Sequence, residues 1–160
     1  MEKLGLEHRD REFLCQLMDG VSFFNGYSGP ELESLCAYFS AYQADAGAEI
    51  FAEGEPGSFL CVVVEGAAEV LKEDHDGVAR VVATVGRDKT LGEMALIDEE
   101  PRSATARATE PAKLLVLTKE RFERMSAEHP RLALEFMFRV ARLLSKRLRR
   151  ASGMLVDHLG

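Results

Sequence analysis

The residues best suited to chemistry lie between Gly92 and Thr105, which read G-E-M-A-L-I-D-E-E-P-R-S-A-T. The run Glu93-Met94-Ala95-Leu96 can form one helical turn, whose unbonded backbone N–H groups and positive dipole end attract anions. Gly92 lets the backbone come close to a ligand. Arg102 offers a planar guanidinium that can bind two phosphate oxygens together. This stretch therefore predicts a binding site for a small phosphodiester.

Glu93 predicts a second contact, because a carboxylate that faced the phosphate would be repelled by it. It can accept a hydrogen bond from a hydroxyl such as a ribose 2′-OH, and a site of this kind would reject a deoxy analogue. Ser103 and Ala104 are small enough to leave room for a ligand, and the hydroxyls of Ser103 and Thr105 can donate to it. Two alternatives stay open. In the first, Glu93 complements the helix dipole and binds no ligand. In the second, Arg102 forms an ion pair with a nearby acid, namely Asp98, Glu99 or Glu100.

The stretch resembles the phosphate-binding cassette of the cyclic nucleotide-binding domain family, which includes the bacterial catabolite activator protein and regulatory subunits of cAMP-dependent kinase. Residue type and spacing agree at nine positions: Gly92, Glu93, Ala95, Leu96, Pro101, Arg102, Ser103, Ala104 and Thr105. The resemblance implies that Arg102 neutralises the cyclic phosphate and that Glu93 holds the ribose 2′-OH. The full set of ligand-binding residues that we expect is Gly92, Glu93, Met94, Ala95, Arg102, Ser103, Ala104 and Arg147.

The base of the ligand is less well defined by these residues. In the family, a hydroxyl directly after the arginine can bridge the phosphate and a guanine amino group, so Ser103 leaves both cAMP and cGMP open. We favour cAMP because the chain resembles bacterial regulators. By its position Arg147 could cap the base by stacking or a hydrogen bond; the alternative is a solvated surface arginine.

The resemblance continues on both sides of the cassette, from about Val21 to Leu148. Residues Gly47 to Glu69 resemble the paired strands of the family, and Lys113 to Phe122 resemble its last strand and the entry to the following helix. Two positions depart from the family pattern: Asp88 stands where a glycine is usual, and Leu91 stands where an aromatic is usual. Aspartate tolerates a left-handed backbone and leucine keeps an apolar contact, so we expect the loop to survive.

The expected fold is α+β: a jelly-roll-like β-roll (double-stranded β-helix) of eight strands with helices before and after it. We expect one domain over 1–160, with N-terminal helices in 1–45, the β-roll in 46–117 with the cassette in 92–105, and C-terminal helices in 118–160. After Gly47, glycine and proline punctuate short apolar runs at the spacing of strands and turns. Asp76-Gly77 has the composition of a hairpin tip.

Helical periodicity supports the flanking elements. The first helix is expected to end at Gly20, and one of its faces carries Leu6, Phe13, Leu14, Leu17 and Met18. A second begins at Ser28-Gly29-Pro30. Near the C-terminus, Thr118 can cap a helix, His129-Pro130 breaks it, and a longer helix follows. Its expected inward residues are Leu132, Phe136, Val140, Leu143 or Leu144, and Leu148.

Composition narrows the class of protein. The 160 residues are 46% hydrophobic and 29% charged, without an apolar run of membrane-helix length or a signal-peptide pattern, so a cytoplasmic protein is expected. The cysteines, at 15, 36 and 61, are odd in number and widely spaced, which favours free thiols over a disulfide framework or metal site. Of the net charge of −7, the segment 131–150 contributes +6. Such a basic helix could bind nucleic acid, although a solvated basic face explains it better.

No arrangement typical of an enzyme is found. The four histidines are dispersed, without the closely spaced pair of a metal-dependent cupin, and no nucleophile motif is recognisable. We therefore expect a ligand sensor that passes binding on through its C-terminal helix, either to its own dimer or to a protein partner, with no DNA-binding domain in these residues. The chief alternative is an interaction scaffold that keeps the roll but has lost nucleotide binding.

Overall fold

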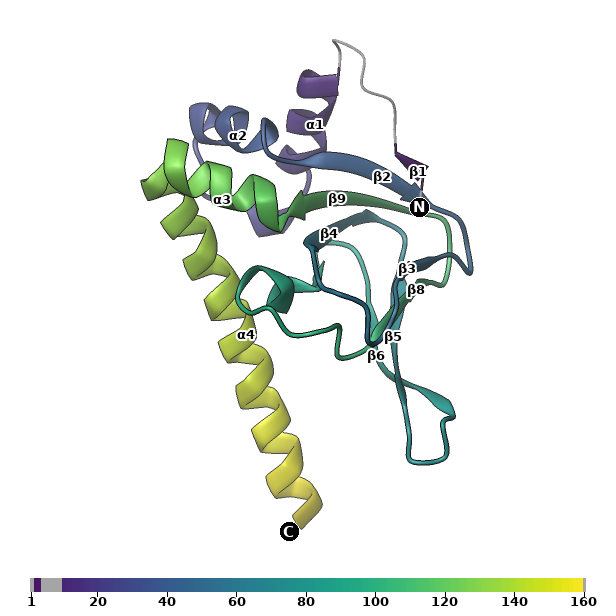
Figure 1. The fold of residues 1–160 in the computed structure, drawn as a ribbon. Coiled ribbons are helices and arrows are strands. Elements are labelled where there is room, and N and C mark those ends of the chain that lie inside the picture. The colour runs from purple at the N-terminus through teal and green to yellow at the C-terminus, as the bar shows by residue number, and fades with distance from the viewer. Residues whose placement is uncertain (1, 4–9, 160) are drawn as a thin grey trace. The chain divides into compact units, whose positions relative to one another are not determined.

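The computed structural model describes residues 2–3 and 10–159 and divides the chain into two compact units, Met1–Phe122 and Glu123–Gly160. The first unit contains the β-roll with the N-terminal helices, and the second contains the long C-terminal helix (Figure 1). Each unit is described by itself below.

The roll consists of two antiparallel sheets, so the expected fold class is confirmed. The five-stranded sheet has the order β1 (Glu2–Lys3), β2 (Ser40–Ala44), β9 (Ala112–Thr118), β4 (Phe59–Glu65) and β7 (Thr90–Leu91). The four-stranded sheet has the order β3 (Glu49–Phe51), β8 (Thr105–Ala108), β5 (Ala68–Glu73) and β6 (Ala79–Val85). Strands β2 to β9 number eight, as expected, although β2 lies before the expected start of the roll; β1 adds a short edge to them.

The core of the roll is built from side chains of both sheets. In β4, Cys61 and Val63 belong to the core cluster, with Leu91 of β7 and Ala106 of β8. Because successive side chains of a strand point to opposite faces, Leu60 and Val62 face away from this cluster, and both are also fully buried. A strand buried on both faces explains why residues 59–64 form a continuous apolar run.

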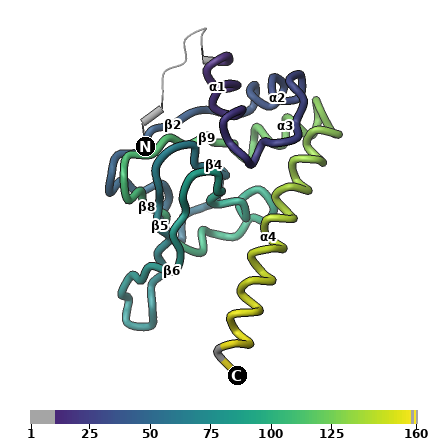
Figure 2. Tube along the Cα trace, turned by 180° about the vertical axis from the view of Figure 1, so that it is seen from behind, coloured from purple at the N-terminus to yellow at the C-terminus, as the bar shows by residue number. Residues whose placement is uncertain are grey.

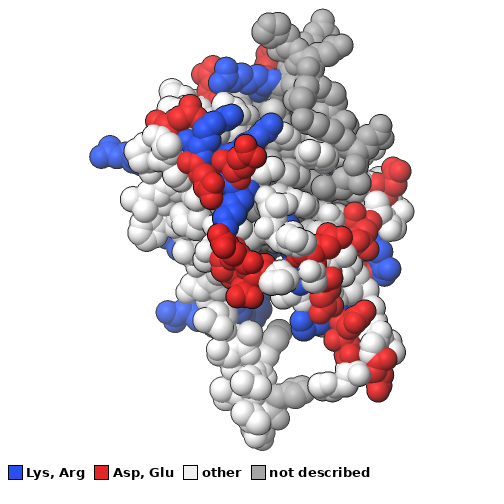
Figure 3. All heavy atoms as spheres, in the orientation of Figure 1, with Lys and Arg blue, Asp and Glu red and all other residues white. Residues whose placement is uncertain are grey.

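The hairpin expected at Asp76-Gly77 joins β5 to β6. Gly77 has a φ of 76°, and the Asp74 carboxylate accepts hydrogen bonds from the backbone N–H groups of Asp76 and Val78. Figure 2 shows this hairpin extending from the roll on the side away from α1 (Asp10–Asp19) and α2 (Gly29–Cys36). Acidic side chains gather over the hairpin side of the face seen in Figure 3.

The N-terminal helices follow the sequence signals closely. Helix α1 ends before Gly20, and a short 3-10 helix, η1 (Ser22–Phe24), leads to α2. Ser28 caps α2 in a capping box with Glu31. On the expected apolar face of α1, Leu14 and Met18 are buried and Phe13 is 38% exposed; Leu6 lies outside the described residues.

The boundary between the N-terminal helices and the β-roll, expected at residue 45, is wrong, because β2 already begins at Ser40. Its sequence, Ser-Ala-Tyr-Gln-Ala, lacks the run of β-branched residues that marks a strand. The strand forms because its backbone pairs with β9 on one side and β1 on the other, which is a tertiary effect.

The largest departure concerns the cysteines. Cys15 of α1 and Cys36 of α2 form a disulfide, with their Cα atoms 5.8 Å apart, whereas the sequence favoured free thiols. Cys61 is free and buried. The spacing of Cys15 and Cys36, with 20 residues between them, does not predict a disulfide, because only the packing of α1 against α2 brings the two residues together.

The C-terminal helices begin as expected. Helix α3 (Lys119–Glu128) spans the border of the two units, and the Thr118 hydroxyl accepts a hydrogen bond from the Arg121 N–H. Helix α4 (Pro130–Leu159) starts after the break at His129. Its residues Leu132, Phe136 and Val140 are buried, but Leu148, expected to face inward, is 68% exposed. Apolar periodicity predicts which face of a helix is hydrophobic, but it does not predict how much of that face is buried by other parts of the protein. None of the described helices is both long enough and apolar enough to cross a bilayer.

Candidate functional site

The turn between β3 and β4 holds the backbone of Arg102. The Arg102 N–H donates to the Glu55 carbonyl at 2.7 Å, and the Gly54 N–H donates to the Arg102 carbonyl at 2.8 Å. In the same turn, a Cβ on Gly57 would lie only 3.0 Å from the Ala95 Cβ. The turn therefore packs directly against the cassette, and glycine at position 57 permits that close approach.

The cassette itself begins where β7 ends. Gly92 has a left-handed backbone (φ 72°, ψ 20°) and caps η2 (Glu93–Leu96), a single turn of 3-10 helix. A Cβ at Gly92 would collide with Nη1 of Arg102 and approach the Phe59 carbonyl to 3.1 Å. The glycine was expected to admit a ligand, and its clearest effect in the structure is to make room for the arginine.

Arg102 is buried, with 7% of its surface exposed. Its Nη1 donates to the Gly92 carbonyl at 3.2 Å and its Nη2 to the Phe59 carbonyl at 2.7 Å. The Nε atom is buried and has no hydrogen-bond partner among the residues that the structure describes. Burial lowers the pKa of Arg102, and electrostatic interactions with Cys61, Glu55 and Glu93 oppose that shift.

Glu93 is likewise buried, with 5% of its surface exposed. Its charge raises the pKa of Arg102. This effect is smaller than the effects of burial, Cys61 and Glu55. The structure thus brings the predicted phosphate-binding and ribose-binding residues into one neighbourhood, although ten positions separate them in the sequence. This proximity is what a sugar phosphate would require of them.

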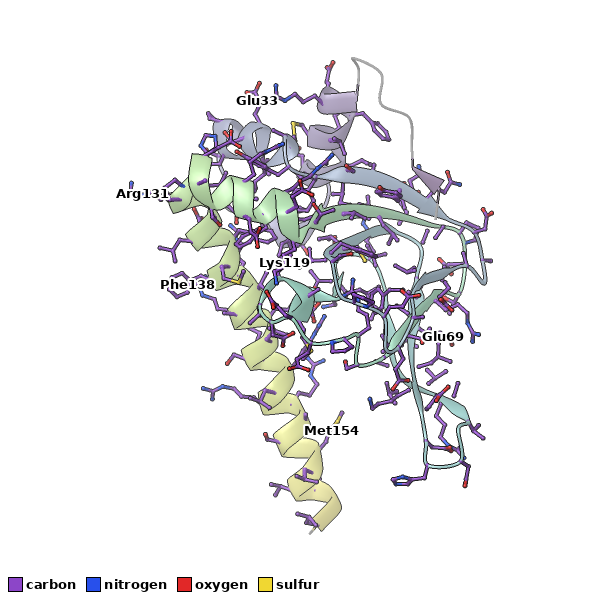
Figure 4. All side chains as sticks on the ribbon, viewed as in Figure 1. Glu33, Glu69, Lys119, Arg131, Phe138 and Met154 are labelled. Carbon is purple, nitrogen blue, oxygen red and sulfur yellow. A yellow bond between two sulfur atoms is a disulfide. The ribbon has the colours of Figure 1, made fainter. Side chains whose placement is uncertain are left out.

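The acids that follow the turn do not pair with Arg102. Glu99 and Glu100 are exposed, and the Asp98 carboxylate accepts a hydrogen bond from the Glu100 N–H. Glu99 lies 3.6 Å from Lys119, which Figure 4 labels beside this turn. Among the described residues, no ion pair involves Arg102, so the alternative in which these acids occupy the guanidinium is wrong.

The remaining predicted site residues lie in different surroundings. Ala95 is buried and Met94 is 50% exposed. Ser103 is exposed and its carbonyl accepts a hydrogen bond from Lys72 at 2.7 Å, while Ala104 is half-buried. The Thr105 hydroxyl, expected to serve a ligand, accepts from the Glu53 N–H at 2.9 Å. Arg147 lies on α4, in the second unit, and its part in binding stays a prediction.

Two features of the site were not anticipated from the sequence. The rings of Phe51 and Phe59 stand 4.0 and 4.8 Å from the guanidinium carbon of Arg102. The second is a contact of Asp88: this residue takes the left-handed conformation that the sequence allowed, with a φ of 71°, and its carboxylate accepts a hydrogen bond from the Ser22 N–H. The sequence placed both phenylalanines in strands. It did not predict that both contact Arg102, because Arg102 comes from another part of the chain.

Neither a metal-binding cluster nor a reactive thiol is found near the site among the described residues. Over the part of the chain that the structure describes, no three His, Cys, Asp or Glu side chains are grouped to hold a metal ion. The thiol of Cys61 is fully buried, which raises its pKa to about 12, while the charge of Arg102 lowers it and that of Glu93 raises it. A thiol with this pKa is protonated and unreactive at neutral pH.

Comparison with known proteins agrees with this geometry. Residues 43–129 match the family described as "Cyclic nucleotide-binding domain". The cyclic AMP receptor protein of Thermus thermophilus is 33% identical over 134 residues, which cover 84% of this chain and 60% of that protein. A cAMP-dependent protein kinase regulatory subunit of Yarrowia lipolytica is 30% identical over 118 residues, covering 74% of this chain and 31% of that protein. The chain thus spans about three fifths, or less, of the length of these relatives.

Solved structures give the same result. A cyclic nucleotide-binding domain from Methylobacillus flagellatus superposes with a TM-score of 0.82 at 28% identity, covering 97% of this chain and 87% of that one. The catabolite activator protein of Thermus thermophilus superposes with a TM-score of 0.72 at 32% identity, covering 83% of this chain and 61% of that one. Since the family match covers more than half of its residues, the chain belongs to the cyclic nucleotide-binding domain family.

Proposed function

We propose that this chain binds a cyclic nucleotide, with cAMP preferred, and acts as a regulatory sensor module. The observation that carries the proposal is the state of Arg102: its guanidinium is buried, and within the described part of the chain no carboxylate pairs with it and no acceptor binds its Nε–H. A buried cation of this kind is costly unless an anion completes it. The cyclic phosphate of the family's ligands is such an anion, and the η2 backbone can add further N–H donors.

Glu93 would bind the ribose of the same ligand. It opens η2 directly after Gly92, and its charge acts on Arg102, so one sugar phosphate can contact both side chains. A buried carboxylate that accepts from the 2′-OH distinguishes a ribose from a deoxyribose, because the deoxy sugar leaves the acceptor unsatisfied. Ser103 and Ala104 would line the phosphate side, and Arg147 would cap the base.

Ligand binding would be passed on through α4. A ligand shifts a conformational equilibrium only by its differential affinity for the two states, so α4 must differ in position or order between them. The expected recipient is a second copy of the chain or another protein. Both phenylalanine and methionine side chains are exposed along α4, and Figure 4 shows Phe138 and Met154 pointing to different sides of it.

Calorimetric titration with cAMP and cGMP tests the proposal. We expect binding of cAMP with a Kd near micromolar, about −8 kcal/mol, and weaker binding of cGMP. Arg102→Leu should cost about 2–5 kcal/mol of this affinity, because it removes the buried partner of the anion. In addition, 2′-deoxy-cAMP should bind the wild type less tightly than cAMP, and Glu93→Ala should abolish that difference.

Arg107→Leu is the matched control, since it removes an arginine from β8 that is bound to Glu69. It should leave the affinity for cAMP within about twofold, a free-energy change below the range expected for Arg102. If cAMP and cGMP both fail to bind the folded protein, the chain is an interaction scaffold with a relic pocket. Equal affinity of the wild type and Arg102→Leu would instead show that Arg102 is not the phosphate ligand.

A further inference from the structure

Arg102 is held by aromatic rings in place of an acid. Its guanidinium carbon lies 4.0 Å from the ring centroid of Phe51 in β3 and 4.8 Å from that of Phe59 in β4. The two rings contact each other edge to face, with centroids 6.1 Å apart and planes at 75°. Phe51 is itself buried in the core cluster of the roll, so the ring nearest to the guanidinium has a fixed position.

Each set of contacts restricts a different movement of the guanidinium. The Phe51 ring, over which the guanidinium carbon lies, restricts tilting of the group, and the carbonyls of Gly92 and Phe59, which accept from Nη1 and Nη2, restrict its rotation. The remaining N–H groups, including the buried Nε–H, stay in the plane and are available to an anion. Fixing a long side chain beforehand lowers the entropy lost when the ligand binds.

A nearby arginine shows the alternative arrangement. Arg107, five residues further along, donates from Nε and Nη2 to Oε1 of Glu69, which Figure 4 labels on β5. A carboxylate partner both positions a guanidinium and cancels its charge. An aromatic ring positions it without cancelling the charge, so the full attraction for an anion is kept.

We propose that Phe51 is a positioning residue, which holds the Arg102 guanidinium pre-oriented for the anionic ligand. The inference rests on the proposed binding of a cyclic nucleotide, and it adds Phe51 as the residue that orients Arg102 for the phosphate. Phe59 contributes mainly through its carbonyl, because its ring is the more distant of the two.

The first test needs no ligand. In the free protein, the side-chain Nε–Hε NMR signal of Arg102, assigned by its loss in Arg102→Lys, should be shifted upfield by the ring current and should exchange slowly with solvent. Phe51→Leu keeps an apolar side chain but removes the nearer ring, so the upfield shift should fall to the smaller contribution of the Phe59 ring. Phe24→Leu, which alters a buried ring in η1, is the control for general loosening and should leave the signal unchanged.

The second test measures cAMP affinity by calorimetry in Phe51→Leu, Arg102→Lys and the double variant. Phe51→Leu should weaken binding by roughly threefold to thirtyfold in the wild-type background. In the Arg102→Lys background the same change should have an effect of less than about twofold, because an ammonium has no plane for the ring to orient. Phe24→Leu should bind cAMP as the wild type does.

The outcomes separate this inference from the proposed function. An unchanged Arg102 signal in Phe51→Leu overturns the positioning role, whatever the ligand. Equal losses of affinity in both backgrounds also overturn it, since Phe51 would then act by general packing. If the wild type binds neither cAMP nor cGMP while the signal behaves as expected, the proposed function fails, and with it the part of the inference that concerns the ligand.

Discussion

At the scale of single residues, the charge of Arg102 and the thiol of Cys61 share one buried environment and respond to it in opposite ways. Burial lowers the pKa of the arginine, because the charged form is the one that loses water. Burial raises the pKa of the thiol to about 12, because its charged form is the thiolate. The site therefore keeps its charge on groups that a ligand can use and keeps Cys61 neutral.

The thiol gives a pH dependence with a definite sign. Below pH 9, the ordinary thiol value, Cys61 is protonated in both the folded and the unfolded chain. Between 9 and about 12 only the unfolded chain ionises, so stability falls as pH rises, by up to about 1.4 kcal/mol per pH unit. Urea unfolding of the oxidised protein should show the stability advantage of wild type over Cys61→Ala shrinking above pH 9; a constant difference would contradict this.

At the scale of elements, the N-terminal helices are tied to one another and to the loop that precedes the cassette. The disulfide Cys15–Cys36 joins α1 to α2. The connection between these helices is bound to the loop before β7, since Arg87 donates to the Gly20 carbonyl at 2.9 Å and the Ser22 N–H donates to Asp88 at 3.1 Å. Asp88 thus has a contact that a glycine could not make.

Reduction of the disulfide should destabilise the protein measurably. A cross-link across 21 residues restricts the unfolded chain and is worth about 3 kcal/mol in the chain-entropy model. We expect reduction, or Cys15→Ser, to lower the Tm by roughly 5–10 °C, measured by circular dichroism with and without dithiothreitol. Cys61→Ala is the control and should keep its response to the reductant. A Tm of the wild type that is indifferent to dithiothreitol would mean that the bond contributes nothing.

At the scale of the whole molecule, charge and apolar surface are unevenly distributed along the chain. The segment 131–150 of α4 is strongly basic, whereas the rest of the chain is acidic. Toward its C-terminal end, the described part of α4 exposes Leu148, Met154 and Leu155, each more than 60% accessible. At about 100° per residue, Leu144, Leu148, Ala151 and Leu155 fall on one face of the helix, which is the stripe that we propose as the seam of a dimer.

Leu155→Glu should weaken that dimer. A charge in an apolar seam would raise the dissociation constant by at least about tenfold, or 1.4 kcal/mol, and light scattering coupled to size-exclusion chromatography at several concentrations would measure it. Met154→Glu is the matched control, because the neighbouring side chain lies about 100° away from Leu155. Equal effects of both changes, or a monomeric wild type, would rule out this face as the seam.

The local signals of the sequence were sufficient for the fold and for the cassette. Glycine and proline punctuation marked the strands of the roll, Ser28 and Thr118 marked helix starts, and Pro130 marked the break between α3 and α4. Nine positions with family spacing located the loop around Arg102. These predictions succeeded because turns, caps and short loops depend on residues that are neighbours in the chain.

By itself, then, the sequence determined the class of fold, the position of the cassette and the family to which the chain belongs. Only the tertiary structure decided that Ser40–Ala44 pairs as a strand, that Cys15 meets Cys36, and that Arg102 lies on Phe51 with its Nη groups bound to backbone carbonyls. The physical reason is the same in each case: these contacts join segments far apart in the chain, and their partners are selected by packing, which no local pattern records.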